Sequence, residues 1–125
     1  MARLLIVDDE EDVREFAANF FRKRKIEVKT AASGEEALDL IDRQKPDLVL
    51  LDIRMNSMDG IETLRRIKEK DKDINVIMVT GQKPEEGAFD KCRQLGAADY
   101  IHKPLELDEL ERIVLNNLSQ AGGSS

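Results

Sequence analysis

Short apolar runs alternate along the chain with segments in which apolar positions recur every three or four residues. This alternation repeats five times and predicts strands at residues 3–7, 26–30, 47–51, 74–79 and 98–101, with a helix after each. Strands that alternate with helices are typical of an α/β fold with a parallel sheet.

The composition of the strands predicts their order in the sheet. Residues 4–7, 48–51 and 76–79 are apolar throughout, as strands covered on both faces are, whereas residues 26–30 alternate and residues 98–101 include Asp99. The second and fifth strands are therefore expected at the edges. This arrangement matches the order 2-1-3-4-5 of a doubly wound, flavodoxin-like (βα)5 three-layer sandwich with right-handed crossovers.

The helical segments carry their own signals. The first shows an apolar stripe expected to face the sheet, made of Val13, Phe16, Ala17, Phe20 and Phe21. The second and third begin with capping-box spacing, Ser33 before Glu36 and Asp59 before Glu62.

The last two helices are expected to differ in stability and in what they expose. Gly87 falls inside the predicted fourth helix, residues 85–94, at a cost of about 1 kcal/mol relative to alanine, so this helix is expected to be the least stable. The fifth helix, about residues 107–118, directs Leu110, Ile113 and Val114 inward and leaves Leu115 off that stripe.

Length and charge narrow the class of protein. The chain has 125 residues and a formal net charge of -6, which predicts one domain, over residues 1–118, and a flexible tail or linker over 119–125. The acidic balance argues against direct nucleic-acid binding. The apolar runs are far shorter than a membrane span, and a single cysteine, Cys92, suits a reducing compartment, so we expect a cytoplasmic protein with no membrane contact.

The residues that follow the strands suggest chemistry. Asp8 and Asp9 follow the first strand, Asp52 the third, Thr80 the fourth and Lys103 the fifth, one residue beyond His102. The carboxyl ends of parallel strands meet at one edge of the sheet, where open α/β sheets bind ligands. Three carboxylates, a hydroxyl and an ammonium are therefore expected to converge there.

The charges of this cluster call for a cation. Carboxylates 4 Å apart repel by about 4 kcal/mol per pair at an effective dielectric near 20, so a proton or a positive ion must offset them. Lys103 supplies one positive charge, and a set of oxygen ligands favours Mg²⁺ or Ca²⁺, of which Mg²⁺ usually also binds a phosphate oxygen. Asp52 would then act as a nucleophile that forms an aspartyl phosphate, with Lys103 and Thr80 contacting the phosphoryl oxygens.

These motifs together resemble the receiver domains of two-component response regulators, chemotaxis regulators among them. The resemblance covers residues 3–118 and is carried by Asp8-Asp9, by Asp52 within residues 51–60, by Thr80-Gly81 and by the segment from Tyr100 to Lys103-Pro104. It implies a phosphorelay protein that acts in signal transduction and catalyses only its own phosphorylation and dephosphorylation, so it is not otherwise an enzyme.

The resemblance also implies residue roles. Asp52 would accept the phosphoryl group from a sensor histidine kinase or phosphotransfer protein, and Mg²⁺ would be bound by Asp9, Asp52 and the backbone carbonyl of Arg54, with Asp8 assisting. Thr80 and Tyr100 would switch the surface of the fourth helix, fifth strand and fifth helix, and the Lys103-Pro104 bond would be cis. Asn56 replaces a frequent proline, and Arg54 and Gln82 occupy positions that tune the lifetime of the phosphorylated state, which stays open.

Several alternatives remain at this point. Glu10, Glu11 and Asp12 are read as acids that favour a helix start, and His102 as an edge-strand residue without a catalytic part. The protein would act on a downstream target, on a missing output domain or as a homodimer. The rival functions are a receiver-like binding module that needs no phosphorylation and, less favoured, an aspartyl-phosphate phosphatase; Arg54 stands where such phosphatases have a second acid.

Overall fold

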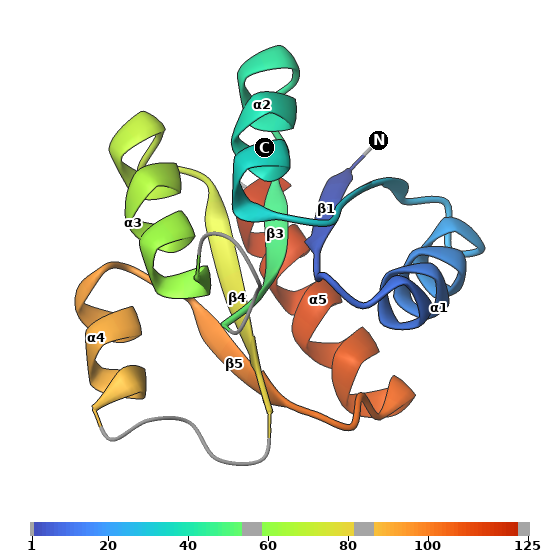
Figure 1. Ribbon diagram of the computed structural model, residues 1–125. Coiled ribbons are helices and arrows are strands. Elements are labelled where there is room, and N and C mark those ends of the chain that lie inside the picture. Colours follow the sequence, from blue (N-terminus) through green and yellow to red (C-terminus); the bar gives the residue numbers. More distant parts are fainter. Residues whose placement is uncertain (1, 54–58, 82–86, 123–125) are drawn as a thin grey trace.

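A computed structural model of the chain describes residues 2–53, 59–81 and 87–122. Strands and helices alternate from end to end (Figure 1), in the order β1 Arg3–Val7, α1 Glu11–Arg22, β2 Glu27–Ala31, α2 Gly34–Arg43, β3 Leu48–Asp52, α3 Gly60–Lys70, β4 Asn75–Thr80, α4 Ala88–Gln94, β5 Asp99–His102 and α5 Leu107–Gly122. Within these residues, no helix has the length and apolar character that crossing a membrane requires.

The five strands form one parallel sheet in the order β2-β1-β3-β4-β5, so the predicted order and both predicted edges are confirmed. Each strand lies within one residue of its predicted position. The apolar runs of β1, β3 and β4 are buried because helices cover both faces of the sheet.

Two apolar layers enclose the sheet. On one face, α1 and α5 pack against it through side chains such as Phe21 and Leu110; on the other, α2, α3 and α4 do so through residues such as Ile41, Ile67 and Cys92. The flavodoxin-like three-layer sandwich is confirmed (Figure 1).

The predicted stripe of the first helix is partly wrong. Phe16 was expected to face the sheet, but it is 49% exposed, whereas Ala18, outside the stripe, is fully buried. The inward face of α1 is therefore centred on Ala17, Ala18 and Phe21. A small alanine can lie against the sheet more closely than a phenylalanine, and hydrophobicity alone does not register this.

The starts of α2 and α3 agree with the predicted caps. The Ser33 hydroxyl accepts a hydrogen bond from the Glu36 amide at 3.1 Å, and an Asp59 carboxylate oxygen accepts one from the Glu62 amide at 2.8 Å. The fourth helix differs from its prediction. It begins only at Ala88, and Gly87 is its N-cap residue with a positive φ of 82°, a conformation that suits glycine.

The last helix buries Leu110, Ile113 and Val114 as expected, and Leu115 is 42% exposed. Its backbone continues to Gly122, whereas the sequence placed its end near Leu118. The division into a domain of residues 1–118 and a tail stays a prediction.

Candidate functional site

All five strands end at the same edge of the sheet, and backbone hydrogen bonds keep their ends in register. The Asp8 amide donates to the Ala31 carbonyl at 3.1 Å, the Ile53 amide to Val79 at 2.9 Å and the Lys103 amide to Thr80 at 2.8 Å. These bonds continue the pairing of the strands by one residue beyond their ends. They therefore hold in place the backbone that carries the site side chains. The edge therefore brings together the chain positions that the sequence predicted to converge.

Lys103 lies at the centre of the charged side chains at this edge. Its Nζ lies 3.1 Å from Asp52 Oδ2, 3.2 Å from Asp8 Oδ2 and 3.2 Å from Glu10 Oε1. The side chains of Asp8 and Asp52 are only 4% and 5% exposed, that of Lys103 is 20% exposed, and that of Glu10 is 63% exposed. Two buried carboxylates and one exposed carboxylate thus share one ammonium.

Electrostatics keep this lysine charged. Burial acts to lower the pKa of Lys103, but the nearby carboxylates of Asp52 and Asp8 outweigh it and hold the pKa above its ordinary value. The ammonium is therefore a permanent positive charge at physiological pH.

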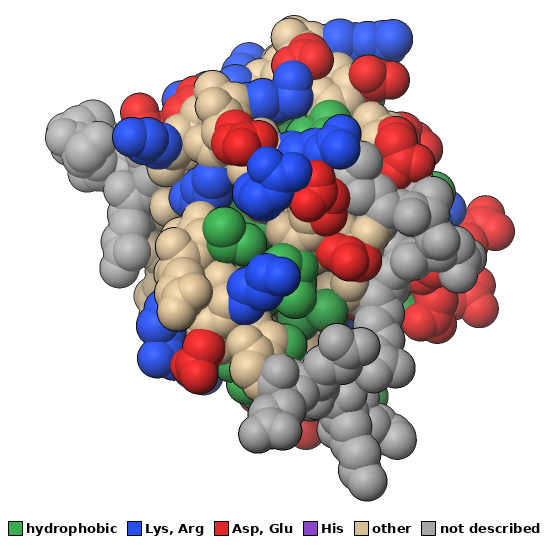
Figure 2. Space-filling model, turned by 60° about the vertical axis from the view of Figure 1, so that its left-hand side comes forward, with side chains coloured by type: hydrophobic (Ala, Val, Ile, Leu, Met, Phe, Trp, Pro, Cys, Tyr) green, Lys and Arg blue, Asp and Glu red, His purple; other side chains and the backbone are tan. Residues whose placement is uncertain are grey.

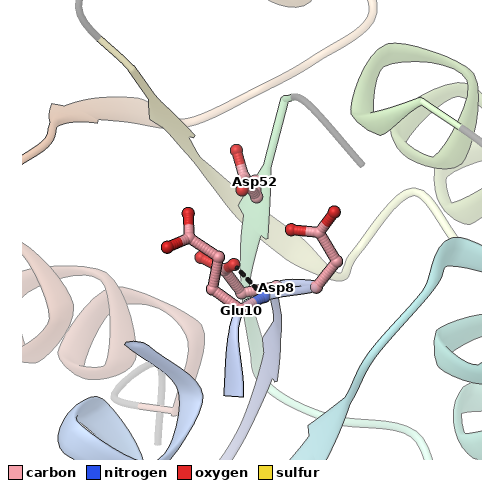
Figure 3. A group of neighbouring side chains, drawn as sticks. Asp8, Glu10 and Asp52 are labelled. Atoms are coloured by element: carbon pink, nitrogen blue, oxygen red, sulfur yellow. Dashed lines mark hydrogen bonds between the residues drawn. The ribbon is translucent and has the colours of Figure 1, made fainter. Parts of the chain in front are cut away.

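The carboxylates outnumber the ammonium. Asp8, Asp9, Glu10 and Asp52 each offer an oxygen that lies within 4.8 Å of the others, and Figure 3 shows three of them at the ends of β1 and β3. With all four ionised and Lys103 protonated, the cluster carries a net charge of -3. Oxygen donors at this spacing could hold a hard divalent cation such as Mg²⁺, which agrees with the sequence expectation.

Glu10 is a site residue that the sequence reasoning missed. It occupies the N-cap position of α1, but its side chain makes no capping hydrogen bond there. Its carboxylate turns to Lys103 instead, and its amide donates to Asp8 Oδ1 at 2.9 Å (Figure 3). The available signal was its position in the short segment between the end of β1 and the start of α1.

Arg14 supports the loop that carries these acids. Its Nη1 donates to the backbone carbonyl of Asp8 at 2.7 Å from the second turn of α1. The bond ties the peptide between Asp8 and Asp9 to the helix. No pattern in the sequence indicated this bond, because the contact depends on how α1 lies against β1.

Thr80 and Tyr100, the two predicted switch residues, make different contacts. Thr80 is buried at the end of β4, and its hydroxyl donates to the Gly81 carbonyl at 3.2 Å. Tyr100 in β5 is half-buried, and its hydroxyl donates to the Phe89 carbonyl in α4 at 2.6 Å. The tyrosine thereby ties α4 to the edge of the sheet, and burial raises its pKa.

Aromatic contacts strengthen that tie. The Phe89 ring meets the Tyr100 ring edge to face, with centroids 4.8 Å apart, and the ring of His102 at 5.7 Å. The exposed His102 thus has a packing contact with α4.

Gly60 lets α3 approach the end of β3. A Cβ at this position would lie 2.1 Å from the backbone oxygen of Asp52 and 2.6 Å from Cα of Ile53. The Gly60 amide donates to the Ile53 carbonyl at 2.7 Å. The start of α3 is therefore held against the backbone of Asp52 at a distance that only glycine permits.

Arg54, Asn56 and Gln82 lie outside the described residues. The Lys103-Pro104 bond is cis, as the resemblance implied.

A groove lies on the face formed by α3 and α4. Figure 2 shows hydrophobic side chains at the centre of that face, between acidic and basic ones. The groove there is lined by Ile61, Ala88 and Leu95 and by charged residues of both signs, among them Glu62, Arg65 and Lys91. Arg65 pairs with Glu62. The groove therefore has no excess of acidic or basic side chains among its lining residues, unlike the acidic cluster at the ends of β1 and β3.

Comparison with known proteins agrees with this geometry. The family model described as the response regulator receiver domain matches residues 4–115. Sporulation initiation phosphotransferase F of Bacillus subtilis is 38% identical over 112 residues, which are 90% of this chain and 90% of that protein. A CheY-like receiver domain protein from Methanospirillum hungatei has a TM-score of 0.93 at 28% identity, with 100% of this chain and 99% of that chain covered.

Longer proteins match over the same region. The regulatory protein AtoC of Escherichia coli is 42% identical over 112 residues, which are 90% of this chain but 24% of AtoC. NtrX of Brucella abortus, solved in complex with ATP, has a TM-score of 0.89 at 32% identity, covering 97% of this chain and 28% of NtrX. The chain thus spans nearly all of some relatives and about a quarter of others.

Proposed function

The chain belongs to the response regulator receiver domain family, and from this premise we propose that Asp52 accepts a phosphoryl group from the phosphohistidine of a sensor kinase or phosphotransfer protein. The observation that carries the proposal is the place of Asp52. Its buried carboxylate ends a central strand, 3.1 Å from a lysine ammonium and within an acidic cluster that carries a net negative charge.

The transfer is a substitution at phosphorus. A carboxylate oxygen of Asp52 forms a bond to phosphorus while the bond from phosphorus to the histidine nitrogen breaks. The electron pair of that bond stays on the nitrogen, and a proton on the other ring nitrogen lets the histidine leave as neutral imidazole. Lys103 donates to a phosphoryl oxygen, which offsets the charge held there. The Thr80 hydroxyl donates to another oxygen after turning from the Gly81 carbonyl.

The acidic cluster suits Mg²⁺. Asp9, Asp52 and the backbone carbonyl of Arg54 would hold it, with Asp8 assisting, and the donors are oxygen atoms of the kind that Mg²⁺ prefers. When bound, Mg²⁺ supplies positive charge that offsets the excess of carboxylates and the phosphoryl oxygens. Asp8 remains paired with Lys103 and so keeps the ammonium beside Asp52.

The output is a change of surface. When Thr80 turns toward the phosphoryl group, Tyr100 gives up its bond to the Phe89 carbonyl, and the packing of α4 on β5 changes. The altered surface of α4, β5 and α5 would bind a downstream protein, an output domain or a second copy through residues such as Leu115, which is exposed on α5. We propose no direct contact with nucleic acid or membrane, and no enzymatic activity beyond phosphorylation and dephosphorylation of Asp52. The cytoplasmic location stays a prediction.

One experiment separates this function from its rivals. The protein is incubated with Mg²⁺ and phosphoramidate, and its intact mass is measured. We expect a gain of one phosphoryl group that is lost in Asp52→Asn and in chelator. Sustained turnover of phosphate esters would favour a phosphatase. Absence of any mass gain and of fluoroberyllate binding would favour a binding module that needs no phosphorylation.

A further inference from the structure

Arg14 places a cation close to the acidic cluster, and its hydrogen bond goes to the backbone. Its Nη1 donates to the carbonyl oxygen of Asp8 at 2.7 Å, a short bond from a charged donor, which is stronger than a bond between neutral groups. The guanidinium charge repels any cation that binds to the four clustered carboxylates. Any benefit of Arg14 to a metal site therefore comes from the backbone that the bond holds.

Asp8 itself is held without Arg14. Its amide continues the strand pairing, and its side chain is 4% exposed. One of its carboxylate oxygens accepts a hydrogen bond from the Glu10 amide at 2.9 Å, and the other lies 3.2 Å from Lys103 Nζ. The carbonyl that Arg14 binds belongs to the following peptide, which joins Asp8 to Asp9. The bond therefore acts on Asp9 more than on Asp8.

This peptide sets the direction of the Asp9 side chain. Because a peptide unit is planar, its rotation changes φ of the residue that follows and turns the Cα–Cβ bond of that residue. The half-buried Asp9 supplies one of the four oxygens that lie within 4.8 Å of one another. By opposing the rotation, the Arg14 bond keeps the Asp9 oxygen among the other three.

We propose that Arg14 is a positioning residue for Mg²⁺, because its bond to the Asp8 carbonyl orients the Asp9 carboxylate that binds the ion. This role rests on the proposed function, in which Asp9 is a ligand. Loss of a residue that orients a metal ligand typically weakens metal binding by about 10–100-fold. Loss of the positive charge alone would instead tighten Mg²⁺ binding, so the sign of the change separates the two effects.

Two matched variants test the bond. Arg14→Gln removes the charge, and its amide nitrogen ends two bonds short of the place that Nη1 occupies. Arg22→Gln is the control, because Arg22 lies at the opposite end of α1 and its guanidinium also donates to a backbone carbonyl, that of Val28 at 3.3 Å. Glutamine and arginine have similar helix propensities, so α1 is retained in both.

Circular dichroism checks that both variants fold. If Arg14→Gln does not, Arg14→Lys replaces it. The lysine variant keeps the charge on a side chain that ends one bond short of Nη1, so weaker Mg²⁺ binding would come from the altered contact alone, and unchanged binding would overturn the proposal.

Mg²⁺ binding is measured by titrating the unphosphorylated protein and following its amide NMR resonances. We expect Arg14→Gln to raise the dissociation constant about threefold to tenfold, because the lost charge offsets part of the effect of the lost bond. Arg22→Gln should match the unmodified protein within about twofold. A purely structural role would lower stability and leave the affinity of the folded protein unchanged. An unchanged or lower dissociation constant in Arg14→Gln would overturn the positioning role, and so would an equal rise in Arg22→Gln.

A second resonance reports the bond itself. The carbonyl ¹³C resonance of Asp8, observed through the amide of Asp9, should shift in Arg14→Gln before Mg²⁺ is added and stay in place in Arg22→Gln. Absence of the shift would show that the bond does not form in solution and would also overturn the proposal.

Phosphorylation separates positioning of the metal from a part in the transfer. With phosphoramidate, an Asp52 oxygen forms a bond to phosphorus, the bond from phosphorus to the protonated nitrogen breaks with its electron pair on nitrogen, and ammonia leaves. The Mg²⁺ concentration for the half-maximal rate should rise about threefold to tenfold in Arg14→Gln, and the rate at saturating Mg²⁺ should stay within about twofold. A lower saturated rate at an unchanged Mg²⁺ requirement would overturn the positioning role.

The two measurements also separate this role from the proposed function. If the unmodified protein binds Mg²⁺ but takes up no phosphoryl group, the proposed function fails, and the Mg²⁺ titration still decides the role of Arg14. If it is phosphorylated but Arg14→Gln binds Mg²⁺ as well as the unmodified protein does, only the role of Arg14 is overturned. If it binds no Mg²⁺, both fail.

Discussion

Replacing Asp52 by asparagine should stabilise the protein in the absence of divalent cations. Asp52 is one of four acids whose oxygens lie within 4.8 Å of one another around a single ammonium. At an effective dielectric near 20, each repulsion at that distance is worth about 3 kcal/mol, and the attraction to Lys103 about 5 kcal/mol. Among the described residues, three repulsions outweigh the attraction to Lys103, and asparagine also removes the cost of burying a carboxylate.

Screening reduces the size of this gain. The Glu10 side chain is 63% exposed and Asp9 is half-buried, so water weakens their share of the repulsion. We therefore expect Asp52→Asn to raise the free energy of unfolding by about 1–3 kcal/mol. Saturating Mg²⁺ should narrow the difference, because the unmodified protein has one more carboxylate to bind the ion.

The assay is urea unfolding followed by far-ultraviolet circular dichroism, first in chelator and then in Mg²⁺. Asp42→Asn is the matched control, since Asp42 is an exposed acid on α2 that pairs with Lys70. Its change should stay within about 0.5 kcal/mol. If Asp52→Asn were less stable than the unmodified protein in chelator, the cluster would be net attractive and the electrostatic reasoning wrong.

Three further changes test other parts of the account. Lys103→Met should lower the free energy of unfolding in chelator by about 3 kcal/mol, because it leaves Asp8 and Asp52 buried without a cation; equal stability in urea unfolding would contradict this. Gly60→Ala should cost about 1–3 kcal/mol in the same assay, since the added Cβ would lie 2.1 Å from the Asp52 oxygen, whereas Gly81→Ala adds a Cβ with no atom within 4 Å and should be nearly neutral. Hydrogen bonds from Arg65 and Arg66 lower the pKa of Glu62 from 4.5 to about 2, so this carboxylate adds stability above pH 4.5 that disappears as the pH falls toward 2. Glu62→Gln should therefore flatten the dependence of the free energy of unfolding on pH between 4.5 and 2. An unchanged pH dependence would refute the contribution of Glu62.

The fold was readable from the sequence because burial on both faces leaves a strong mark. Strands covered on both sides are apolar throughout, and this separated β1, β3 and β4 from the edges. The helix starts were readable for a similar reason, since Ser33 and Asp59 act on amides only three residues away. Such local and repetitive features need no knowledge of the tertiary structure.

The errors lie where tertiary contacts decide. Phe16 was assigned to the buried face of α1 because it is hydrophobic, but the close packing of Ala18 turns it outward. Gly87 was placed inside α4, although its positive φ makes it the residue before the helix. In both cases the residue type alone did not show where the residue lies in the folded structure, because tertiary packing decides that position.

The candidate site was predicted in outline. The topology places residues that follow parallel strands at one edge, so the contact between Asp52 and Lys103 could be expected. The direction of single side chains could not. Glu10 reaches Lys103, Arg14 reaches the Asp8 carbonyl and the Thr80 hydroxyl points to Gly81 because of the particular loop geometry after each strand.

Asp52 should be the one carboxylate that becomes esterified. After reaction with phosphoramidate and Mg²⁺, borohydride would reduce the acyl phosphate to an alcohol and leave homoserine at the modified position, which peptide mass spectrometry locates. We expect homoserine at position 52 alone. Homoserine at position 8 or 9, or a borohydride-resistant phosphate on a serine or threonine, would contradict it.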